Sequence, residues 1–371
     1  MVKIIEIEGK EFIHYQPFSV NVAIIQGTTA DEVGNISMED EPVILGVLNA
    51  AQAAKACGGM VIAQVKRVTK RDSIPTRNVV VPGVLVDVIV VDPEQRQSLA
   101  DFNPYWTGEV KKPWSDIRKM IPMDERKVIL RRAAMELEIG DLVNLGIGIP
   151  VNLPYLALEE DFIDMVTFST EHGVIGGIPS GVEVFGSHIN PGAIISAPDN
   201  FVMYHGGCLD ISYLGFAEID KFGNVNVSRF GSKLRGSGGL IDITSRTKKL
   251  VFCGTFTAGG LEIEINNEKL RIIKEGKNCK FVSQVQHITF SGPRAIENNQ
   301  EVLYITERAV FQLKKEGLIL IEVAPGIDIE RDICNKINFS IKKSENIKTI
   351  DRKLFNPNLV GFSKIIPNKV K

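Results

Sequence analysis

The chain has 371 residues, of which 44% are hydrophobic and 24% are charged, and its formal net charge is −2. This composition is typical of a globular protein long enough to form two domains, each with its own core. The small net charge gives no electrostatic basis for binding nucleic acid or a membrane surface, and no apolar run approaches the roughly 20 residues that span a bilayer.

The first hundred residues alternate between strand and helix patterns. Val20–Gln26 is a short apolar run typical of a buried strand, and Pro42–Ala56 has a helical pattern. A second strand is predicted over Met60–Val65, and strand-rich structure over Val79–Val91. Residues 103–126 are rich in proline, tryptophan and charge without a period, which predicts a linker.

The same alternation continues through the second half of the chain. An amphipathic helix is predicted over Lys127–Glu138, and a strand over Leu142–Leu145 leads into a glycine loop and a helix over Leu153–Glu160. Further strands are predicted at Asp210–Ile219, Val225–Val227, Leu250–Cys253, Leu261–Ile265 and Leu270–Ile273. The lysine- and asparagine-rich residues 336–371 are expected to form a C-terminal tail. Strands that alternate with helices indicate an α/β fold with a largely parallel sheet.

The stretch Met165–Pro179, which reads MVTFSTEHGVIGGIP, combines a buried strand with a glycine-rich loop. Glu171 lies at the junction, where a carboxylate in apolar surroundings needs a partner or a function. The glycines that follow it allow close backbone approach to a ligand and leave N–H groups free to donate. These features suit attack on an acyl carbon by Glu171, with an oxyanion held nearby. A helix-cap or turn glutamate is the alternative.

Two segments of the chain resemble each other. Ala30-Asp31-x-x-Gly34-Asn35-Ile36 recurs 189 positions later as Ile219-Asp220-x-x-Gly223-Asn224-Val225. A second match, 180 positions apart, relates CGGMV at 57–61 to SGGLI at 237–241. The order of the matches predicts two duplicated domains, although such residues favour turns in any context.

The repeat predicts the domain boundaries. The first copy has about 63 fewer residues before its turn than the second, so it is expected to lack a helix, a glycine loop and a strand. We expect an incomplete first domain over 1–102, a linker over 103–126, a second domain with Glu171 over 127–335, and a tail over 336–371.

Several long motifs together are far more specific than any single glycine pattern. They are VNLGIGIP at 143–150, TEHGVIGGIP at 170–179, YLGFAEIDKFGNVNVSRFG at 213–231, GSGGLIDI at 236–243, FCGTFTAGG at 252–260 and TERAVF at 306–311. With them the chain resembles the family I coenzyme A transferases, and among these the propionate, acetate and 3-oxoacid CoA-transferases. The resemblance implies two similar open α/β domains of the kind shared with NagB and RpiA, the first incomplete at its N-terminus.

The resemblance also implies a reaction. Glu171 stands at the position of the family's glutamate that becomes a glutamyl-CoA thioester, whereas His172 departs from the small residue expected next to it. The implied activity is ping-pong transfer of CoA from a short-chain acyl-CoA to a carboxylate such as acetate, propionate or a 3-oxoacid. Coenzyme A is then a substrate and no cofactor is bound permanently. The expected partners are acyl-CoA, small carboxylic acids, further copies of the chain, and a separately encoded N-terminal segment.

Candidate CoA-binding or oxyanion-stabilising residues occur in four places. They are Gly146, Ile147, Gly148, Ile149 and Pro150; Gly176 and Gly177; Asn224; and Gly236, Gly238 and Gly239. Each has a structural alternative: a strand-to-helix turn, an Asx turn at Asn224, or a helix N-terminus packed on the sheet. Lys233 and Arg235 could meet CoA phosphates or simply be solvated.

The sequence excludes some other kinds of site and leaves two other functions open. No G-x-S-x-G motif indicates a serine nucleophile, and five scattered cysteines have no metal-ligand spacing, so no metal is expected. The N-terminal sequence has no signal-peptide pattern, and a cytoplasmic location is expected. An acyl-CoA hydrolase on the same scaffold, and a chain that binds CoA or a partner without turnover, remain as alternatives.

Overall fold

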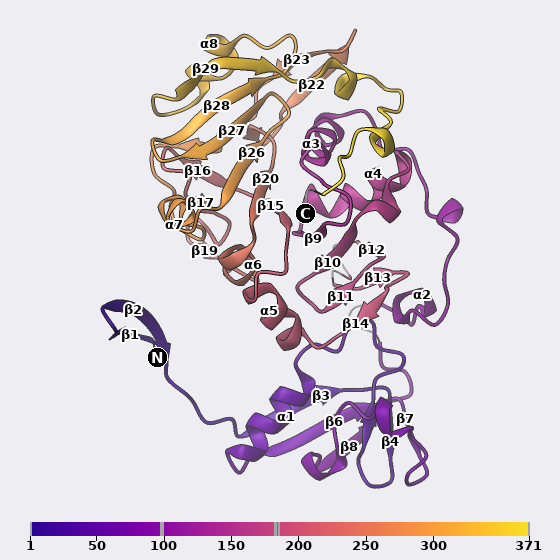
Figure 1. Cartoon of the computed structure of the whole chain (residues 1–371). Helices are drawn as coiled ribbons and strands as arrows, with labels where there is room; N and C mark the ends of the chain where they lie inside the picture. Colours follow the sequence, from indigo (N-terminus) through magenta and orange to yellow (C-terminus); the bar gives the residue numbers. More distant parts are fainter. Residues whose placement is uncertain (1, 97–99, 182–183, 185, 370–371) are drawn as a thin grey trace. The chain divides into compact units, whose positions relative to one another are not determined.

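The computed structural model describes residues 2–96, 100–181, 184 and 186–369, and the chain divides into two compact units, residues 1–103 and 104–371 (Figure 1). The first unit contains a parallel sheet of β3 (Val22–Gln26), β6 (Met60–Val65) and β8 (Val88–Val91) in the order β3-β6-β8. Helix α1 (Val47–Ala56) packs on one face of this sheet, where Ala23, Ile25 and Val61 are buried. A small sheet of β4 (Thr29–Asp31), β5 (Ile36–Ser37) and β7 (Arg67–Thr69) and a hairpin of β1 (Val2–Ile7) and β2 (Lys10–Tyr15) complete it.

Two predicted elements of the first unit are shorter than expected. The helix begins at Val47 rather than at position 42, because Leu45 has a left-handed φ of 53° that interrupts helical geometry. Within Val79–Val91 only Val88–Val91 is a strand, since Gly83–Leu85 forms a 3₁₀ turn. The Gly83 N–H donates to Asn35 Oδ1 at 2.9 Å, which binds this turn to the Asp-x-x-Gly-Asn segment instead of to a sheet neighbour.

The second unit is built on a ten-stranded sheet with the order β14-β11-β10-β9-β15-β20-β26-β27-β28-β29. The five central strands β10, β9, β15, β20 and β26 run parallel to one another, which confirms the α/β class with a parallel-rich sheet. Their bounds are β9 (Leu142–Leu145), β10 (Thr167–Thr170), β11 (Val174–Ile175), β14 (Ala193–Ile194), β15 (Ile211–Gly215), β20 (Lys249–Cys253), β26 (Glu301–Ile305), β27 (Ala309–Lys314), β28 (Gly317–Val323) and β29 (Lys342–Thr349).

Helices and small sheets surround the central sheet of this unit. The helices are α2 (Pro104–Thr107), α3 (Glu125–Ala134), α4 (Leu153–Glu159), α5 (Ala197–His205), α6 (Leu240–Arg246), α7 (Gly292–Glu297) and α8 (Ile329–Asp332). The smaller sheets pair β12 (Ile178–Pro179) with β13 (His188–Ile189), β16 (Glu218–Asp220) with β17 (Val225–Asn226) and β25 (Phe281–Val282), β18 (Arg229–Phe230) with β19 (Lys233–Leu234), β21 (Thr257–Ala258) with β24 (Asn278–Cys279), and β22 (Glu262–Asn266) with β23 (Lys269–Lys274).

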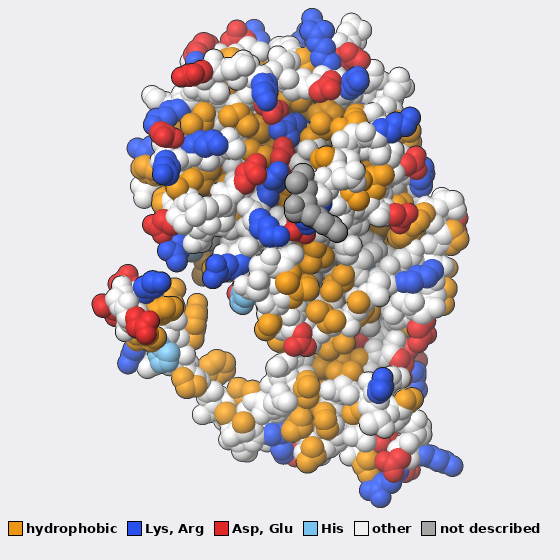
Figure 2. Space-filling model, viewed as in Figure 1, with side chains coloured by type: hydrophobic (Ala, Val, Ile, Leu, Met, Phe, Trp, Pro, Cys, Tyr) orange, Lys and Arg blue, Asp and Glu red, His pale blue; other side chains and the backbone are white. Residues whose placement is uncertain are grey.

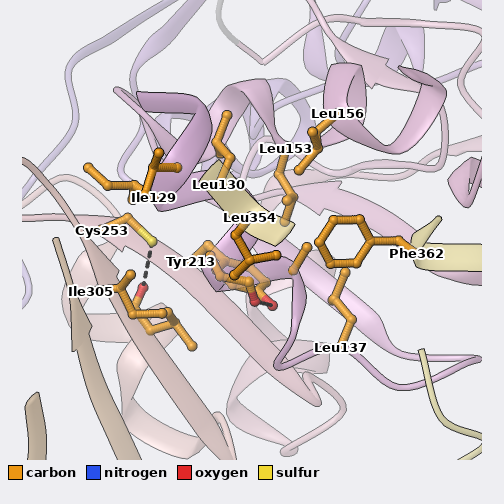
Figure 3. Close-up of a cluster of buried hydrophobic side chains, with 14 of the residues drawn as sticks. Ile129, Leu130, Leu137, Leu153, Leu156, Tyr213, Cys253, Ile305, Leu354 and Phe362 are labelled. Atoms are coloured by element: carbon orange, nitrogen blue, oxygen red, sulfur yellow. Dashed lines mark hydrogen bonds between the residues drawn. The ribbon is translucent and has the colours of Figure 1, made fainter. Parts of the chain in front are cut away.

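The two faces of the ten-stranded sheet bury two separate cores. On one face, α3 and α4 contribute Ile129, Leu130 and Leu153 against strand residues Tyr213 and Cys253 (Figure 3). On the other face, α6 packs through Leu240 and Ile243 on Leu214 and Phe252. Because both faces are covered, the parallel strands carry nearly continuous apolar sequence.

Residues 336–369, the described part of the segment 336–371 expected to be a tail, belong to the second unit. Residues Lys342–Thr349 form the edge strand β29, paired in parallel with β28. Farther on, Leu354, Phe355 and Phe362 are buried in the core beside α3. Charged residues on the exposed edge strand account for the lysine-rich composition that suggested a tail.

Residues 104–123, expected to belong to a linker, also pack within the second unit. They contain α2 and a 3₁₀ turn at Trp114–Asp116. The Lys112 N–H donates to Asn190 Oδ1 at 2.7 Å, and the Asn190 side-chain amide donates to the Lys112 carbonyl at 2.8 Å. The division of the chain therefore falls between Asn103 and Pro104, without a free connecting segment in this region.

The two turn segments of the predicted repeat have the same local structure. In both units the aspartate of the repeat, Asp31 or Asp220, accepts bonds from the backbone N–H and the side-chain amide of the asparagine, Asn35 or Asn224. The flanking strands β4 and β16 each pair with an antiparallel and a parallel partner. Strands β3 and β15 also start 189 positions apart, as do β6 and β20. The parallel pairs β3-β6 and β15-β20 and the turns that follow β4 and β16 are therefore arranged alike in the two units.

The second sequence match, between CGGMV and SGGLI, is not a structural equivalence. Met60 and Val61 lie in strand β6, whereas Leu240 and Ile241 lie in helix α6. The segment equivalent to Met60 begins at Lys249, the first residue of β20. A helix end and a helix start both use glycine, which explains the coincidence.

Candidate active site

A cavity of about 800 Å³ opens at the carboxyl ends of the parallel strands β10, β9, β15 and β20. Each strand contributes the residues that directly follow it: Glu171, Gly146–Ile149, Phe216–Ala217 and Gly254–Thr255. The loop Arg235–Leu240 before α6 and the segment Thr257–Leu261 close further sides. The crevice outside the carboxyl ends of the strands is where open α/β sheets bind ligands, and the volume suits a small molecule.

Glu171 is held at the cavity wall by a tight turn. It follows the last residue of β10, Thr170, and the Gly173 N–H donates back to the Thr170 carbonyl at 3.2 Å. Gly173 has a φ of 96°, and a Cβ there would lie 2.1 Å from the Ile195 carbonyl oxygen, so only glycine fits. Thr170 is anchored in turn by a hydrogen bond between its hydroxyl and His188 Nε2. The turn therefore fixes the backbone on both sides of Glu171.

The carboxylate of Glu171 is incompletely paired. Its Oε2 atom is buried and has no hydrogen-bond partner among the residues that the structure describes. An unpaired buried carboxylate oxygen is costly, and such atoms occur where a ligand or a reaction uses them. Glu171 therefore has a buried carboxylate oxygen that no described side chain or backbone group neutralises.

The glycine loop before α6 lies against Glu171. A Cβ placed on Gly239 would come within 3.1 Å of Glu171 Cγ, which is tighter than ordinary van der Waals contact. Gly239 is also the residue that precedes the first turn of α6, and it has an ordinary φ of −79°. The absence of a side chain at this position therefore leaves room for the glutamate rather than permitting an unusual backbone conformation.

Eight of the predicted site residues come together around this cavity. They are Glu171, Gly146, Ile147, Gly148, Ile149, Gly236, Gly238 and Gly239. Arg235 also lines it, whereas Lys233, the other basic residue considered beside the glycine loop, is not among the lining residues.

Four predicted site residues lie elsewhere. Pro150 is buried at the start of the 3₁₀ turn before α4. Gly176 and Gly177 pack against the backbone of residues 189–192, outside the cavity lining. Asn224 donates to Asp220 and accepts from the Gly292 N–H, so it serves the Asx turn of the repeat and does not orient Glu171. The His172 ring does not line the cavity either and packs against Gly186.

Sequence reasoning assigned no role to several residues that line the cavity. The FCGTFTAGG segment at 252–260 carries part of the family resemblance, and its residues Gly254, Thr255 and Gly259 line the cavity. Phe216, Glu125 and Lys280 also line the cavity, from parts of the chain that no local motif connects. Only the fold brings them to the same edge of the sheet.

Two ionisable groups of the cavity have shifted pKa values. Burial raises the pKa of the Cys253 thiol, so this cysteine stays protonated at neutral pH and is a poor nucleophile. Burial lowers the pKa of the Lys280 ammonium to about 8, and the nearby Glu307 carboxylate partly opposes this shift. Glu171 is therefore a better candidate nucleophile than Cys253.

Metal-binding clusters and membrane-spanning helices are both absent from the described part of the chain. No cluster of three or more histidine, cysteine, aspartate or glutamate side chains there is arranged to hold a metal ion. In the same residues no helix has the length and apolar character needed to cross a membrane.

The fold and the cavity are those of an α/β enzyme with a carboxylate beside its substrate pocket. The family described as coenzyme A transferase matches residues 1–92. The chain is 42% identical over 365 residues to acetate CoA-transferase YdiF of Escherichia coli K12, covering 98% of this chain and 68% of that protein. It is 43% identical over 375 residues to caffeate CoA-transferase of Acetobacterium woodii, covering 99% and 71%.

Solved structures agree with the sequence relatives. The YdiF apoenzyme of E. coli O157:H7 superposes with a TM-score of 0.93 at 40% identity, over 99% of this chain and 69% of that one. A thioester complex of the same enzyme with CoA gives a TM-score of 0.91 at 40% identity, with the same coverage. The chain belongs to the coenzyme A transferase family, which confirms the predicted family, fold class and enzyme class.

Proposed function

We propose that this enzyme moves CoA from a short-chain acyl-CoA to a small carboxylic acid through a glutamyl-CoA thioester on Glu171. The observation that carries the proposal is the buried, unpaired Oε2 of Glu171 in a cavity at the carboxyl ends of the parallel strands. The related YdiF enzyme has been solved as a thioester complex with CoA, which supports a covalent route. The names of the relatives, acetate and caffeate CoA-transferase, support a carboxylic acid as acceptor.

The reaction needs only one carboxylate. The Glu171 carboxylate attacks the acyl carbon of the donor, forming a mixed anhydride and releasing CoA thiolate. The thiolate then attacks the glutamyl carbonyl, which expels the first carboxylic acid as its anion and leaves glutamyl-CoA. An acceptor carboxylate reverses these two steps, so that acyl-CoA leaves and Glu171 is regenerated. No proton has to be moved in any of these steps, so the proposed route needs no general acid or base beside Glu171.

Backbone groups are the proposed stabilisers of the charge that develops in each step. The loops Gly146–Ile149 and Gly236–Gly239 both line the cavity that contains Glu171, and five of their eight residues are glycines. Losing one oxyanion donor typically costs about 10²- to 10³-fold in rate. A bulky side chain in these loops would exclude the acyl carbon from its donors.

The test is to locate the covalent adduct. The protein is incubated with acetyl-CoA or propionyl-CoA, digested, and examined by mass spectrometry, with borohydride reduction of the thioester as confirmation. We expect CoA on the peptide that contains Glu171, loss of the adduct in Glu171→Ala, and near-complete loss of turnover in Glu171→Asp, whose shorter side chain breaks the attack geometry. Glu125→Gln is the matched control, because Glu125 is a second glutamate of the same cavity and should leave the adduct in place.

The kinetics distinguish transfer from the alternatives. Parallel double-reciprocal lines are expected for a ping-pong transferase, whereas intersecting lines would indicate direct transfer in a ternary complex. Release of free CoA without an acceptor would indicate a hydrolase. An adduct on another residue, with Glu171→Ala still active, would refute the mechanism.

We propose in addition that the two units are two copies of one domain, and that a helix of the α3 kind covers the open face of the first. In the second unit, Ile211 and Tyr213 of β15 are buried under α3. The equivalent residues of β3, Val22 and Ile24, are 50% and 77% exposed. Hydrophobic side chains are visible on the surface of the first unit, at the bottom of Figure 2.

The proposed cover is a segment equivalent to residues 124–175 of the second unit. An apolar sheet face of this kind favours association. Adding such a segment should protect the first unit from limited proteolysis and raise transferase activity. If the 371-residue chain has full activity alone, with residues 1–103 protease-resistant, the face needs no cover.

A further inference from the structure

A second charged residue of the cavity, Lys280, has no assigned function. It lies between β24 and β25, and its ammonium stands over the Phe216 ring, 4.9 Å from the ring centre. Both residues line the cavity that contains Glu171. Among the described residues, no carboxylate lies within ion-pair distance of Lys280. Glu307 acts on it only at longer range, and burial lowers its pKa to about 8.

The internal repeat shows what is unusual about this lysine. By the strand pairing of β4 with β7 and of β16 with β25, Arg67 occupies the equivalent position in the first unit. Arg67 is neutralised there by Glu39 at 2.8 Å and Asp40 at 3.4 Å. The residues 189 positions after these carboxylates are Ser228 and Arg229. The second unit thus keeps the cation and has lost both of its anionic partners.

A cation that is partly buried beside an aromatic ring and lacks a fixed counter-ion suits an anionic ligand. CoA offers a pyrophosphate and a 3′-phosphate, and the acceptor offers a carboxylate, which must bind near Glu171. The distance between Lys280 and Glu171 along the sheet edge decides which of these anions Lys280 can bind.

The sheet order supplies that distance. Glu171 follows β10, Phe216 follows β15, and the Phe216 ring packs on Gly254, which follows β20. In the order β10-β9-β15-β20, Lys280 therefore lies two to three strand spacings from Glu171, roughly 10–14 Å. The pantetheine arm between the sulfur and the pyrophosphate has about as many bonds as four extended residues, roughly 14 Å.

From this agreement we propose that Lys280 binds the pyrophosphate of CoA while the thiol end reaches Glu171. The proposal rests on the use of CoA by this enzyme and on the cavity described above. The other charged residues that line the same cavity are Glu125, Arg126, Glu171 and Arg235. Arg235 lies over a different ring of the lining, Phe230, at 5.6 Å from the ring centre. Lys280 differs from the two arginines in lying over Phe216, which follows β15 and packs on Gly254 at the end of β20.

Calorimetric titration of the full chain with CoA, dephospho-CoA and pantetheine tests the assignment. In Lys280→Met, affinity for CoA and for dephospho-CoA should fall about tenfold to hundredfold, as for loss of a charge-assisted bond, and affinity for pantetheine should not change. Lys280→Arg should retain most of the affinity and controls for folding, together with the melting temperature. The matched control is Lys221→Met, because the Lys221 ammonium also lies 4.9 Å from a phenylalanine ring but outside the cavity.

Each other outcome contradicts the assignment in its own way. Unchanged CoA binding in Lys280→Met removes Lys280 from the site. A loss seen with CoA but not with dephospho-CoA assigns the lysine to the 3′-phosphate, and an equal loss with pantetheine excludes a phosphate altogether. If the unaltered chain fails to bind CoA, the proposed function is contradicted, and not only the assignment of Lys280.

Discussion

Replacing Gly239 with alanine should displace the nucleophile without unfolding the protein. The new Cβ would lie 3.1 Å from Glu171 Cγ and 3.4 Å from its Cβ. Because ordinary carbon contacts are about 3.5–4.0 Å, the glutamate side chain has to move by roughly 0.5 Å. A misplacement of about 1 Å can cost about 10²-fold in rate, so a displacement of half that size should cost about tenfold in kcat/KM.

The stability of the protein should change little in this variant. Gly239 has a φ of −79°, which alanine adopts without strain, and the cost of alanine before the first turn of α6 is about 1 kcal/mol or less. Gly181→Ala is the control, because its Cβ would meet no atom of the described residues within 4 Å and its backbone is not in the left-handed region. The melting temperatures of both variants should stay near that of the parent.

The assay combines kcat/KM with the rate at which CoA becomes attached to Glu171. We expect both to fall in Gly239→Ala and neither to fall in Gly181→Ala. A Gly239→Ala protein that forms the adduct at the parental rate would show that Glu171 has more freedom than the contact implies. A loss of activity matched by an equal loss of stability would also refute the argument, since the effect would then be on folding.

Three further perturbations test other parts of the molecule. Ile24→Ala should change the free energy of unfolding by no more than about 0.5 kcal/mol in urea titration, because the side chain is 77% exposed, whereas Tyr213→Ala at the equivalent buried position should cost about 3–5 kcal/mol. Glu160→Ala removes the carboxylate that lies 2.8 Å from the fully buried Arg131 guanidinium, so the free energy of unfolding should fall by about 3–5 kcal/mol and the C-terminal segment should become sensitive to proteolysis. Glu264→Ala, which removes a surface ion pair with Arg271, is the control and should have neither effect. CoA affinity, measured by calorimetry, should fall about tenfold between pH 7 and pH 9 as Lys280, with its pKa of about 8, loses its proton, and the fall should be absent in Lys280→Met.

The amino-acid sequence was sufficient wherever the physics is local. The strand that ends at Thr170, the loop at 146–149 and the glycines before α6 are each encoded by a few consecutive residues, and all of them reach the cavity. The Asp-x-x-Gly-Asn repeat was readable for the same reason. Its aspartate and asparagine bond to each other within five residues, so the motif forms wherever it occurs.

Tertiary structure decided what depends on distant neighbours. Gly176 and Gly177 belong to a stretch that looked suited to ligand binding, yet their close approach is to the backbone of residues 189–192. Asn224 serves a turn because Gly292, 68 positions away, supplies the donor for its amide oxygen. Within the lysine-rich C-terminal segment, Lys342–Thr349 forms strand β29 because the backbone of β28 pairs with it at the edge of the sheet.

The order of the strands determined the composition of the active site. Lys280, Phe216 and Gly259 come from separate parts of the sequence, and no local pattern relates them to Glu171. Phe216 lines the same cavity as Glu171 because neighbouring parallel strands end at one edge of the sheet, in the order β10-β9-β15-β20. Lys280 and Gly259 reach the cavity through two small sheets, in which β25 pairs with β16 and β21 pairs with β24. A sequence specifies strands through local side-chain alternation, but the pairing of strands depends on packing over the whole sheet, which appears only in the folded structure.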